Sequence, residues 1–170
     1  MIDFTKLDYL KIGNEKQIRA HEVLTKYKIF DILDYYSPIL AGTIPIEIDI
    51  EESDLDIICE VKDKVEFEKF LIQAFKDFDL KIEILNINNE KSLVCNFKLE
   101  EFPIEIFGQN KPTTQQNAYL HMIAEYKILQ EKGEEFKQKI IDLKKQRMKT
   151  EPAFGKLLHL ENPYEDLLKF

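Results

Sequence analysis

The sequence predicts an α+β fold in which a mixed β-sheet of about five strands packs against flanking helices and leads into a helical C-terminal subregion. Three observations support this prediction. Short apolar runs rich in Ile, Val and Phe, typical of strands, gather between residues 39 and 108. Longer segments with apolar residues at helical spacing lie before, within and after that region. Two of the apolar runs are separated by a polar turn, which favours a hairpin.

The length and the composition indicate one globular domain. A chain of 170 residues that is 44% hydrophobic can bury about 70% of its unfolded surface without disulfides. No internal repeat or low-complexity linker divides it, so residues 1–170 are predicted to form a single domain. Its core spans about residues 14–110, and the helical subregion spans about residues 114–170. No apolar run reaches about 18 residues and the N-terminus lacks a signal peptide, which predicts no membrane association and a cytoplasmic location.

The charge and the cysteines narrow the classes of function. A net charge of −8 argues against long nucleic acid as a partner, because phosphate binding mainly requires clustered Lys and Arg. A single nucleotide remains possible, because a metal ion can carry its charge. Cys59 and Cys95 lie in apolar, strand-like runs without metal-ligand spacing, so we expect two small buried hydrophobic residues.

The N-terminal part is predicted to be helical. Asn14 is a typical N-cap, and the apolar residues that follow recur at helical spacing with a possible break near Lys28. This pattern predicts one bent helix or two consecutive helices that end before Pro38.

The strand region begins at residue 38 with a strand and turn that reach Thr43, and a second strand follows over residues 55–61. Between them, residues 44–50 alternate apolar and other residues, which suggests an extended connection. Glu47 and Asp49 fall on its opposite face, where they either add carboxylates to a site or belong to a solvated loop.

A helix and three further strands are predicted next. Residues 63–78 form an amphipathic helix with Asp63 as N-cap and a buried face that includes Val65. Runs 80–87 and 92–99, joined by a turn at residues 88–91, form a hairpin. In the last run, residues 102–108, Pro103 favours a strand start or an edge strand.

Helices dominate the rest of the chain. Thr114 is predicted to begin a long helix that ends near Gly133, with Leu120 among its core residues. The next helix, residues 134–148, is basic: it either attracts an anionic ligand or presents a solvated face. The tail is rich in apolar residues, so we expect two short helices, separated at Asn162-Pro163, that close over the core or over a partner subunit.

Three carboxylates stand in unusual places. Asp54 and Asp56 alternate with apolar residues on the second strand, so they share one face about 6 to 7 Å apart. Such a pair repels and loses solvation unless a cation lies between the two groups, and a divalent metal is the simplest candidate. Glu105 stands between two isoleucines on the last strand, either as the outward residue of a half-exposed strand or as a third carboxylate of the same site.

A polar stripe runs along the helix that begins near Thr114. Asn117, His121 and Glu125 follow one another at i, i+4 and i+8 and therefore share one helix face. The stripe is either a hydrogen-bonded surface feature or a set of substrate contacts.

The order and spacing of these residues carry a family resemblance. The pattern resembles the signature of the DNA polymerase beta-like nucleotidyltransferase superfamily. Its three segments are Leu40-Ala41-Gly42-Thr43, Asp54-Leu55-Asp56-Ile57 and Ile104-Glu105-Ile106. Most of the chain, including KTEPAF, also looks like an uncharacterised bacterial family related to that superfamily. Thr43 departs from the usual Gly or Ser, and Glu105 from the commoner Asp.

The resemblance implies a metal-dependent nucleotidyltransferase with a nucleotidyltransferase-like sheet. Asp54, Asp56 and Glu105 would bind Mg²⁺ or Mn²⁺ and carry out catalysis, while Gly42, Thr43 and Ser53 would bind the nucleotide. The partners would be a nucleoside triphosphate and a small-molecule or protein acceptor with a hydroxyl group. Two alternatives remain open: a nucleotide-binding module without turnover, and an antitoxin-like interaction protein on the same fold.

Overall fold

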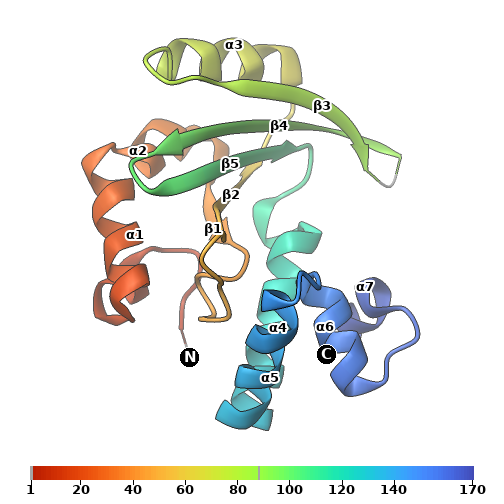
Figure 1. The fold of residues 1–170 in the computed structure, drawn as a ribbon. Coiled ribbons are helices and arrows are strands. Elements are labelled where there is room, and N and C mark those ends of the chain that lie inside the picture. The colour runs from red at the N-terminus through yellow and green to blue at the C-terminus, as the bar shows by residue number, and fades with distance from the viewer. Residues whose placement is uncertain (1, 88) are drawn as a thin grey trace.

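A five-stranded mixed sheet forms the centre of the protein. The computed structural model describes residues 2–87 and 89–170 (Figure 1). The strand order is β1-β2-β5-β4-β3, and of these pairings only β2 with β5 is parallel. The strands are β1 Ile39–Ala41, β2 Leu55–Glu60, β3 Lys81–Ile87, β4 Glu90–Leu99 and β5 Phe102–Gln109. The predicted α+β fold with a mixed sheet of five strands and flanking helices is confirmed.

Two helices precede the sheet, as the N-terminal pattern predicted. Asn14 caps the first by accepting a hydrogen bond from the Gln17 backbone N–H at 2.9 Å, and the Gln17 side chain accepts one from the Asn14 N–H. Lys28 has a φ of 52°, which breaks the helical path between the two. The elements are the short 3-10 helix η1 Asp8–Ile12, α1 Glu15–Lys26, α2 Ile29–Leu33 and the 3-10 helix η2 Asp34–Tyr36.

The two faces of the sheet supply two hydrophobic cores. Helices α1, α2 and α3 cover one face, and the C-terminal helices lie on the other side of the sheet (Figure 1). Because side chains alternate along a strand, Leu55 and Ile57 enter the first core, while Ile58 enters the second. Asp56 shares the face of Ile58 and is therefore directed toward the C-terminal helices. Both cysteines are buried and free, as predicted.

Helix α3, Lys64–Ala74, is shorter than the predicted segment. Asp63 caps it by accepting hydrogen bonds from the backbone N–H groups of Val65 and Glu66. Phe67 and Leu71 are buried against the sheet, but the prediction that Val65 is buried was wrong, because its side chain is 62% exposed. Val65 lies two positions before Phe67, which places it about 200° away around the helix.

The connection between β1 and β2 differs from the prediction. Residues 44–47 form a turn instead of an extended segment, with Ile48 N–H donating to the Thr43 carbonyl at 3.1 Å. The alternating isoleucines are still buried, because the turn directs Ile44 into the first core and Ile48 into the second. Its two acidic side chains form ion pairs outside the predicted site, Glu47 with Lys137 at 2.6 Å and Asp49 with Lys16 at 3.1 Å.

The hairpin is present, with two corrections. The predicted turn covered residues 88–91, but residue 88 lies outside the described residues, and residues 90 and 91 already belong to β4. Pro103 is the second residue of β5, which lies inside the sheet between β2 and β4. The strand-start interpretation of Pro103 is therefore confirmed, and the edge-strand interpretation was wrong.

The C-terminal helices differ from the predictions at their boundaries. The long helix α4 begins at Asn117, because residues 113–115 form the 3-10 helix η3, and Leu120 is 38% exposed instead of buried. The tail closes over the second core, where Phe154 and Leu167 are buried. The elements are α4 Asn117–Lys132, α5 Glu134–Lys145, α6 Thr150–Leu158, α7 Pro163–Asp166 and the 3-10 helix η4 Leu167–Lys169.

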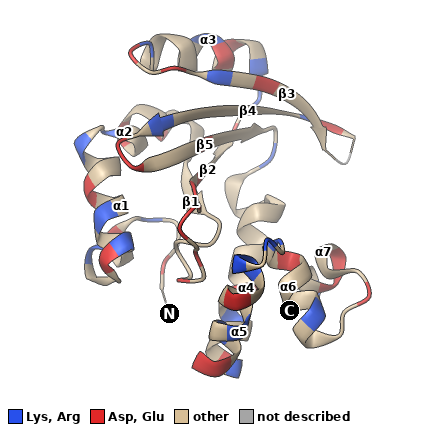
Figure 2. Cartoon of the chain, in the orientation of Figure 1, with Lys and Arg blue, Asp and Glu red and all other residues tan. Residues whose placement is uncertain are grey.

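Two basic residues of α5 pair with acids. Blue and red segments alternate along the pair α4 and α5 (Figure 2), and Lys137 pairs with Glu47 and Lys139 with Glu135. Lys144 is instead buried. Among the described helices, none has the length and apolar character needed to cross a bilayer.

Gly108 on β5 gives a test of the first core. A Cβ at this position would lie 2.8 Å from ring carbon Cε1 of Phe67 and 2.8 Å from Cγ2 of Val61. We expect Gly108→Ala to lower the free energy of unfolding by about 1–3 kcal/mol through overpacking, measured by urea denaturation. Adding Phe67→Leu should restore part of the loss, and unchanged stability in Gly108→Ala would contradict this packing.

Candidate active site

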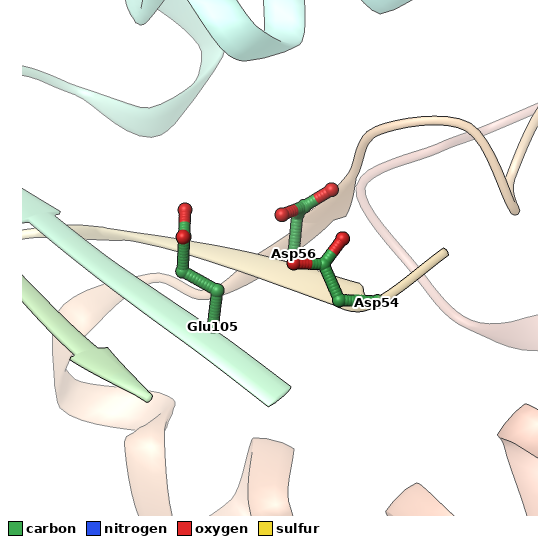
Figure 3. Close-up of side chains that lie close together, drawn as sticks. All are labelled: Asp54, Asp56 and Glu105. Atoms are coloured by element: carbon green, nitrogen blue, oxygen red, sulfur yellow. The ribbon is translucent and has the colours of Figure 1, made fainter. Parts of the chain in front are cut away.

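Three carboxylates converge on the face of the sheet that is directed toward the C-terminal helices. Asp54 directly precedes β2, Asp56 lies within it, and Glu105 lies opposite Asp56 on the parallel strand β5. Carboxylate oxygens of the three residues lie within 4.8 Å of one another (Figure 3). Their apolar neighbours on both strands point into the first core, which fixes the register that brings the acids together: Leu55, Ile57, Ile104 and Ile106.

The three acids form an electrostatically unfavourable group. Each is partly buried, and their side chains form no hydrogen bond or ion pair within residues 2–87 and 89–170. Burial raises the pKa of Asp56 well above its usual range, and the charges of Asp54 and Glu105 raise it further, while Lys144 opposes the shift. Burial and the Asp54 charge also raise the pKa of Glu105. A bound cation would offset this repulsion.

The donor set fits a hard divalent cation. Mg²⁺ and Mn²⁺ prefer carboxylate oxygens, and one oxygen from each acid is available at the same place. The predicted convergence of Asp54, Asp56 and Glu105 is therefore found in the structure.

The turn after β1 packs directly against Asp56. Gly42 has a φ of 82°, a region that favours glycine, and a Cβ there would lie 2.1 Å from Oδ2 of Asp56. Thr43 follows, and its hydroxyl donates to the Ser53 hydroxyl at 3.3 Å, while Ser53 Oγ accepts from the Ile50 N–H at 2.9 Å. Gly42 and Thr43 line a cavity, whereas Ser53 does not line it and contacts the turn through Thr43 and Ile50.

A cavity of about 550 Å³ opens beside these residues, between the sheet and helices α4 and α6. Gly42, Thr43, Asp56 and Glu105 line its sheet side. On its helical side lie Asn117, His121 and Glu125, the three residues of the predicted stripe, together with Thr150 and Glu151. His121 and Glu125 are buried and Asn117 is exposed. The stripe therefore faces the cavity rather than an open helix surface, and its contact with a substrate stays a prediction.

His121 is held by two neighbours from the C-terminal helices. Its Nε2 lies 2.8 Å from the carbonyl oxygen of Tyr164, and its Nδ1 lies 3.5 Å from Oε1 of Glu151. Burial lowers the pKa of His121, but the hydrogen bonds to Glu151 and Tyr164 raise it more, so that the net shift is upward. A protonated ring has N–H donors for both oxygens.

Sequence reasoning missed two residues of this region. Glu151 lies in KTEPAF, a segment noted only as part of a family resemblance, and nothing local marked it as facing the acids. Lys144 belongs to the basic run, but it is only 6% exposed and its ammonium donates to the Ile48 carbonyl at 2.7 Å. Burial lowers the pKa of Lys144 to about 8, against the opposing charges of Glu125, Asp49 and Asp56.

The His121 pair leads to a pH prediction. Glu151→Gln removes the negative charge that raises the pKa of His121. The pKa should therefore fall, because burial lowers it and the Tyr164 carbonyl alone then opposes burial. Since the folded pKa in the wild type is raised, the stability contributed by His121 is complete below its unfolded value near 6.5 and is lost as the pH rises through the folded value. An NMR titration of the ring, assigned with His121→Gln, measures the shift. An unchanged titration in Glu151→Gln would contradict the pairing.

Comparisons with known proteins agree with this fold. A family model described as a domain of unknown function, DUF4269, matches residues 22–170. No curated protein matches the chain.

Solved structures of two RNA terminal transferases and of a polymerase core share the fold at low sequence identity. The RNA terminal uridylyl transferase Cid1 matches with a TM-score of 0.52 and 11% identity, covering 77% of this chain and 41% of that one. A cytoplasmic RNA terminal U-transferase matches with a TM-score of 0.51 and 14% identity over 81% and 41% of the chains. The polymerase core of the RNA surveillance complex TRAMP gives 0.51 and 10% over 92% and 49%. The chain thus spans about two fifths to a half of their length.

Proposed function

The chain belongs to the DUF4269 family, which has no assigned function, and from its site we propose that it is a metal-dependent nucleotidyltransferase. It would transfer a nucleoside monophosphate from a nucleoside triphosphate to a hydroxyl group. One observation carries the proposal: three carboxylates meet beside a glycine turn at a cavity, on a fold shared with a terminal uridylyl transferase. Asp54, Asp56 and Glu105 are the proposed metal ligands and catalytic residues.

Mg²⁺ or Mn²⁺ is the proposed cofactor. When bound, divalent ions in such a site stabilise the charge that develops on the attacking and leaving oxygens of phosphoryl transfer. Asp54 and Asp56 would hold the ions, and Gly42 and Thr43 would position the β- and γ-phosphates, with backbone N–H groups at a turn where no Cβ intervenes. Ser53 would contribute by keeping Thr43 in place.

The proposed reaction is an in-line displacement. The acceptor hydroxyl oxygen forms a bond to the α-phosphorus, and the bond from that phosphorus to the bridging oxygen breaks. Pyrophosphate leaves with the electron pair of the broken bond. The hydroxyl proton passes to a carboxylate oxygen of Glu105, the acid that lies opposite Asp56 on β5.

The acceptor is proposed to be a small molecule or a protein. The structural neighbours carry RNA in their names, but this chain has a net charge of −8. That charge favours an acceptor that needs no extended basic groove. The single-domain organisation, the cytoplasmic location and the bacterial origin of the family stay predictions.

A nucleotide-binding module without turnover is the second candidate. The Thr43 hydroxyl is engaged by Ser53, and threonine adds a methyl group beside the proposed phosphate position. Both features would weaken the contacts to a triphosphate that is about to react. This candidate shares the metal-dependent binding of the first and differs from it in releasing no pyrophosphate.

The test combines binding with turnover. We expect calorimetric titration to detect binding of at least one nucleoside triphosphate with Mg²⁺ and none with EDTA, and an acceptor mixture to stimulate pyrophosphate release. Glu105→Gln should reduce release by about 100-fold or more, the range of general base catalysis, and should reduce triphosphate binding less. Binding that is independent of Mg²⁺ would overturn the proposal, and metal-dependent binding without release from any acceptor mixture would favour the second candidate.

A further inference from the structure

The helical wall of the cavity carries an acid that neither the proposed chemistry nor the folded chain uses. Glu125 on α4 is 4% exposed and lines the cavity. Its carboxylate makes no hydrogen bond and no ion pair with any residue that the structure describes. Buried carboxylates are normally paired, so an unpaired one at a cavity wall indicates a missing ligand group.

The charges around Glu125 indicate which kind of group is missing. Burial and the neighbouring Glu151 raise the pKa of Glu125 well above its usual range, and Lys144 only partly opposes this. The Lys144 ammonium is already bound to the Ile48 carbonyl and does not line the cavity. Glu151 in turn is occupied by His121. Glu125 is therefore the carboxylate on this wall that is free to bind a donor.

The cavity as a whole is acidic. Its lining contains five carboxylates, Asp56, Glu90, Glu105, Glu125 and Glu151, against one lysine, Lys111. Divalent ions would neutralise Asp54, Asp56 and Glu105 on the sheet side of the cavity. Glu125 lies on the helical side and would keep its charge unneutralised by those ions. A ligand that bridges the two sides would meet metal and phosphate at one end and an unpaired carboxylate at the other.

We propose that the acceptor is a small hydroxyl compound that also carries a positively charged amine, and that Glu125 binds this amine. The ammonium would form a charge-assisted hydrogen bond with the Glu125 carboxylate, while the hydroxyl of the same molecule reaches Glu105. Asn117 at the cavity mouth and Thr150 on α6 add polar groups for further hydroxyls. This inference rests on the proposed function, because it names the class of acceptor for the same site.

Binding of matched compounds tests the inference without requiring turnover. Each pair differs in an amine: ethanolamine with ethylene glycol, serinol with glycerol, and glucosamine with glucose. The dissociation constants are measured by NMR titration of the full chain with Mg²⁺ present. We expect at least one amine to bind about tenfold or more tightly than its partner, since a hydrogen bond to a charged group contributes about that much. Glu125→Gln should abolish the preference.

Two controls keep the result interpretable. Glu131→Gln changes an exposed glutamate on the same helix, outside the cavity, and should leave the preference unchanged. Glu125→Asp keeps the charge and should retain part of the preference. It therefore distinguishes loss of the charge from a change of fold in Glu125→Gln.

The outcomes separate this inference from the proposed function. Equal binding of amine and alcohol in every pair, while Mg²⁺-dependent triphosphate binding persists, would overturn the amine acceptor and leave the nucleotidyltransferase intact. A Glu125-dependent preference among the four nucleoside triphosphates, with no preference for amines, would also overturn the amine acceptor and would assign Glu125 to the nucleobase. An amine preference without any triphosphate binding would support the amine site and overturn the proposed reaction.

Discussion

Asp56→Asn is expected to abolish metal-dependent triphosphate binding while making the metal-free protein more stable. Asparagine keeps the shape of the side chain but removes the charge that a hard cation requires, so we expect affinity for the Mg²⁺–triphosphate complex to fall by about 100-fold or more. The same charge is unfavourable in the absence of a cation, because burial, Asp54 and Glu105 raise the pKa of Asp56.

The sign of the stability change follows from that shift. A carboxyl group whose folded pKa is raised destabilises the folded state at pH values above its unfolded pKa, and this penalty disappears in acid. At neutral pH without metal, Asp56→Asn should therefore raise Tm by about 2–4 °C, the change that about 1 kcal/mol produces in a chain of this size. Below the unfolded pKa the two proteins should melt alike.

Thermal unfolding with and without Mg²⁺, together with calorimetry, measures both effects. Glu60→Gln is the matched control, since it removes a carboxylate from the same strand and is not part of the cavity lining. It should change neither the triphosphate affinity nor its dependence on Mg²⁺. A variant at position 56 that still binds triphosphate only with Mg²⁺ would contradict the assignment of Asp56 as a ligand.

Gly42→Ala is the second change with a large expected effect. The new methyl group would lie 2.1 Å from Oδ2 and 3.1 Å from Cγ of Asp56, so the aspartate must rotate or the turn must move. Rotation displaces Asp56 from the other two acids, and a movement of the turn displaces the proposed phosphate contacts of Gly42 and Thr43, so we expect triphosphate affinity to fall by about 100-fold. The positive φ adds a backbone cost of about 1–2 kcal/mol to the free energy of unfolding.

Gly133→Ala separates the two contributions. Gly133 has a similar φ of 77°, but no atom lies within 4 Å of its added Cβ. It should therefore show a backbone cost in urea denaturation, since its φ of 77° and ψ of −172° lie in a region that only glycine adopts readily, and no change in triphosphate binding. Equal triphosphate binding by Gly42→Ala and the wild type would show that the contact with Asp56 does not position the site.

Local patterns were sufficient to predict much of the fold. The caps at Asn14 and Asp63 were recognised from residue type, and alternation identified the shared face of Asp54 and Asp56, whereas Glu105 was joined to them only by the family resemblance. The pairing of β2 with β5 depended on a family resemblance, because no local signal specifies which distant strands become neighbours.

The incorrect predictions arise where tertiary contacts override a local pattern. Residues 44–50 alternate like a strand, but the turn buries Ile44 in the first core and Ile46 and Ile48 in the second, so burial at alternate positions arises without an extended strand. A lysine in a basic run is typically solvated, yet Lys144 is buried because the Ile48 carbonyl of a distant turn accepts its hydrogen bond. The stripe on α4 was identified by spacing, but its direction depended on how the helix packs.

The parallel pairing of β2 with β5 also determines the stage of folding at which Asp54, Asp56 and Glu105 come together. Asp56 and Glu105 are neighbours in the sheet although the whole of α3, β3 and β4 separates them along the chain. The hairpins β3–β4 and β4–β5 need only local contacts, so they can form early, whereas the β2–β5 ladder must close a long loop. If that ladder closes after the rate-limiting step, a bound cation cannot guide folding and instead slows unfolding by stabilising the completed sheet.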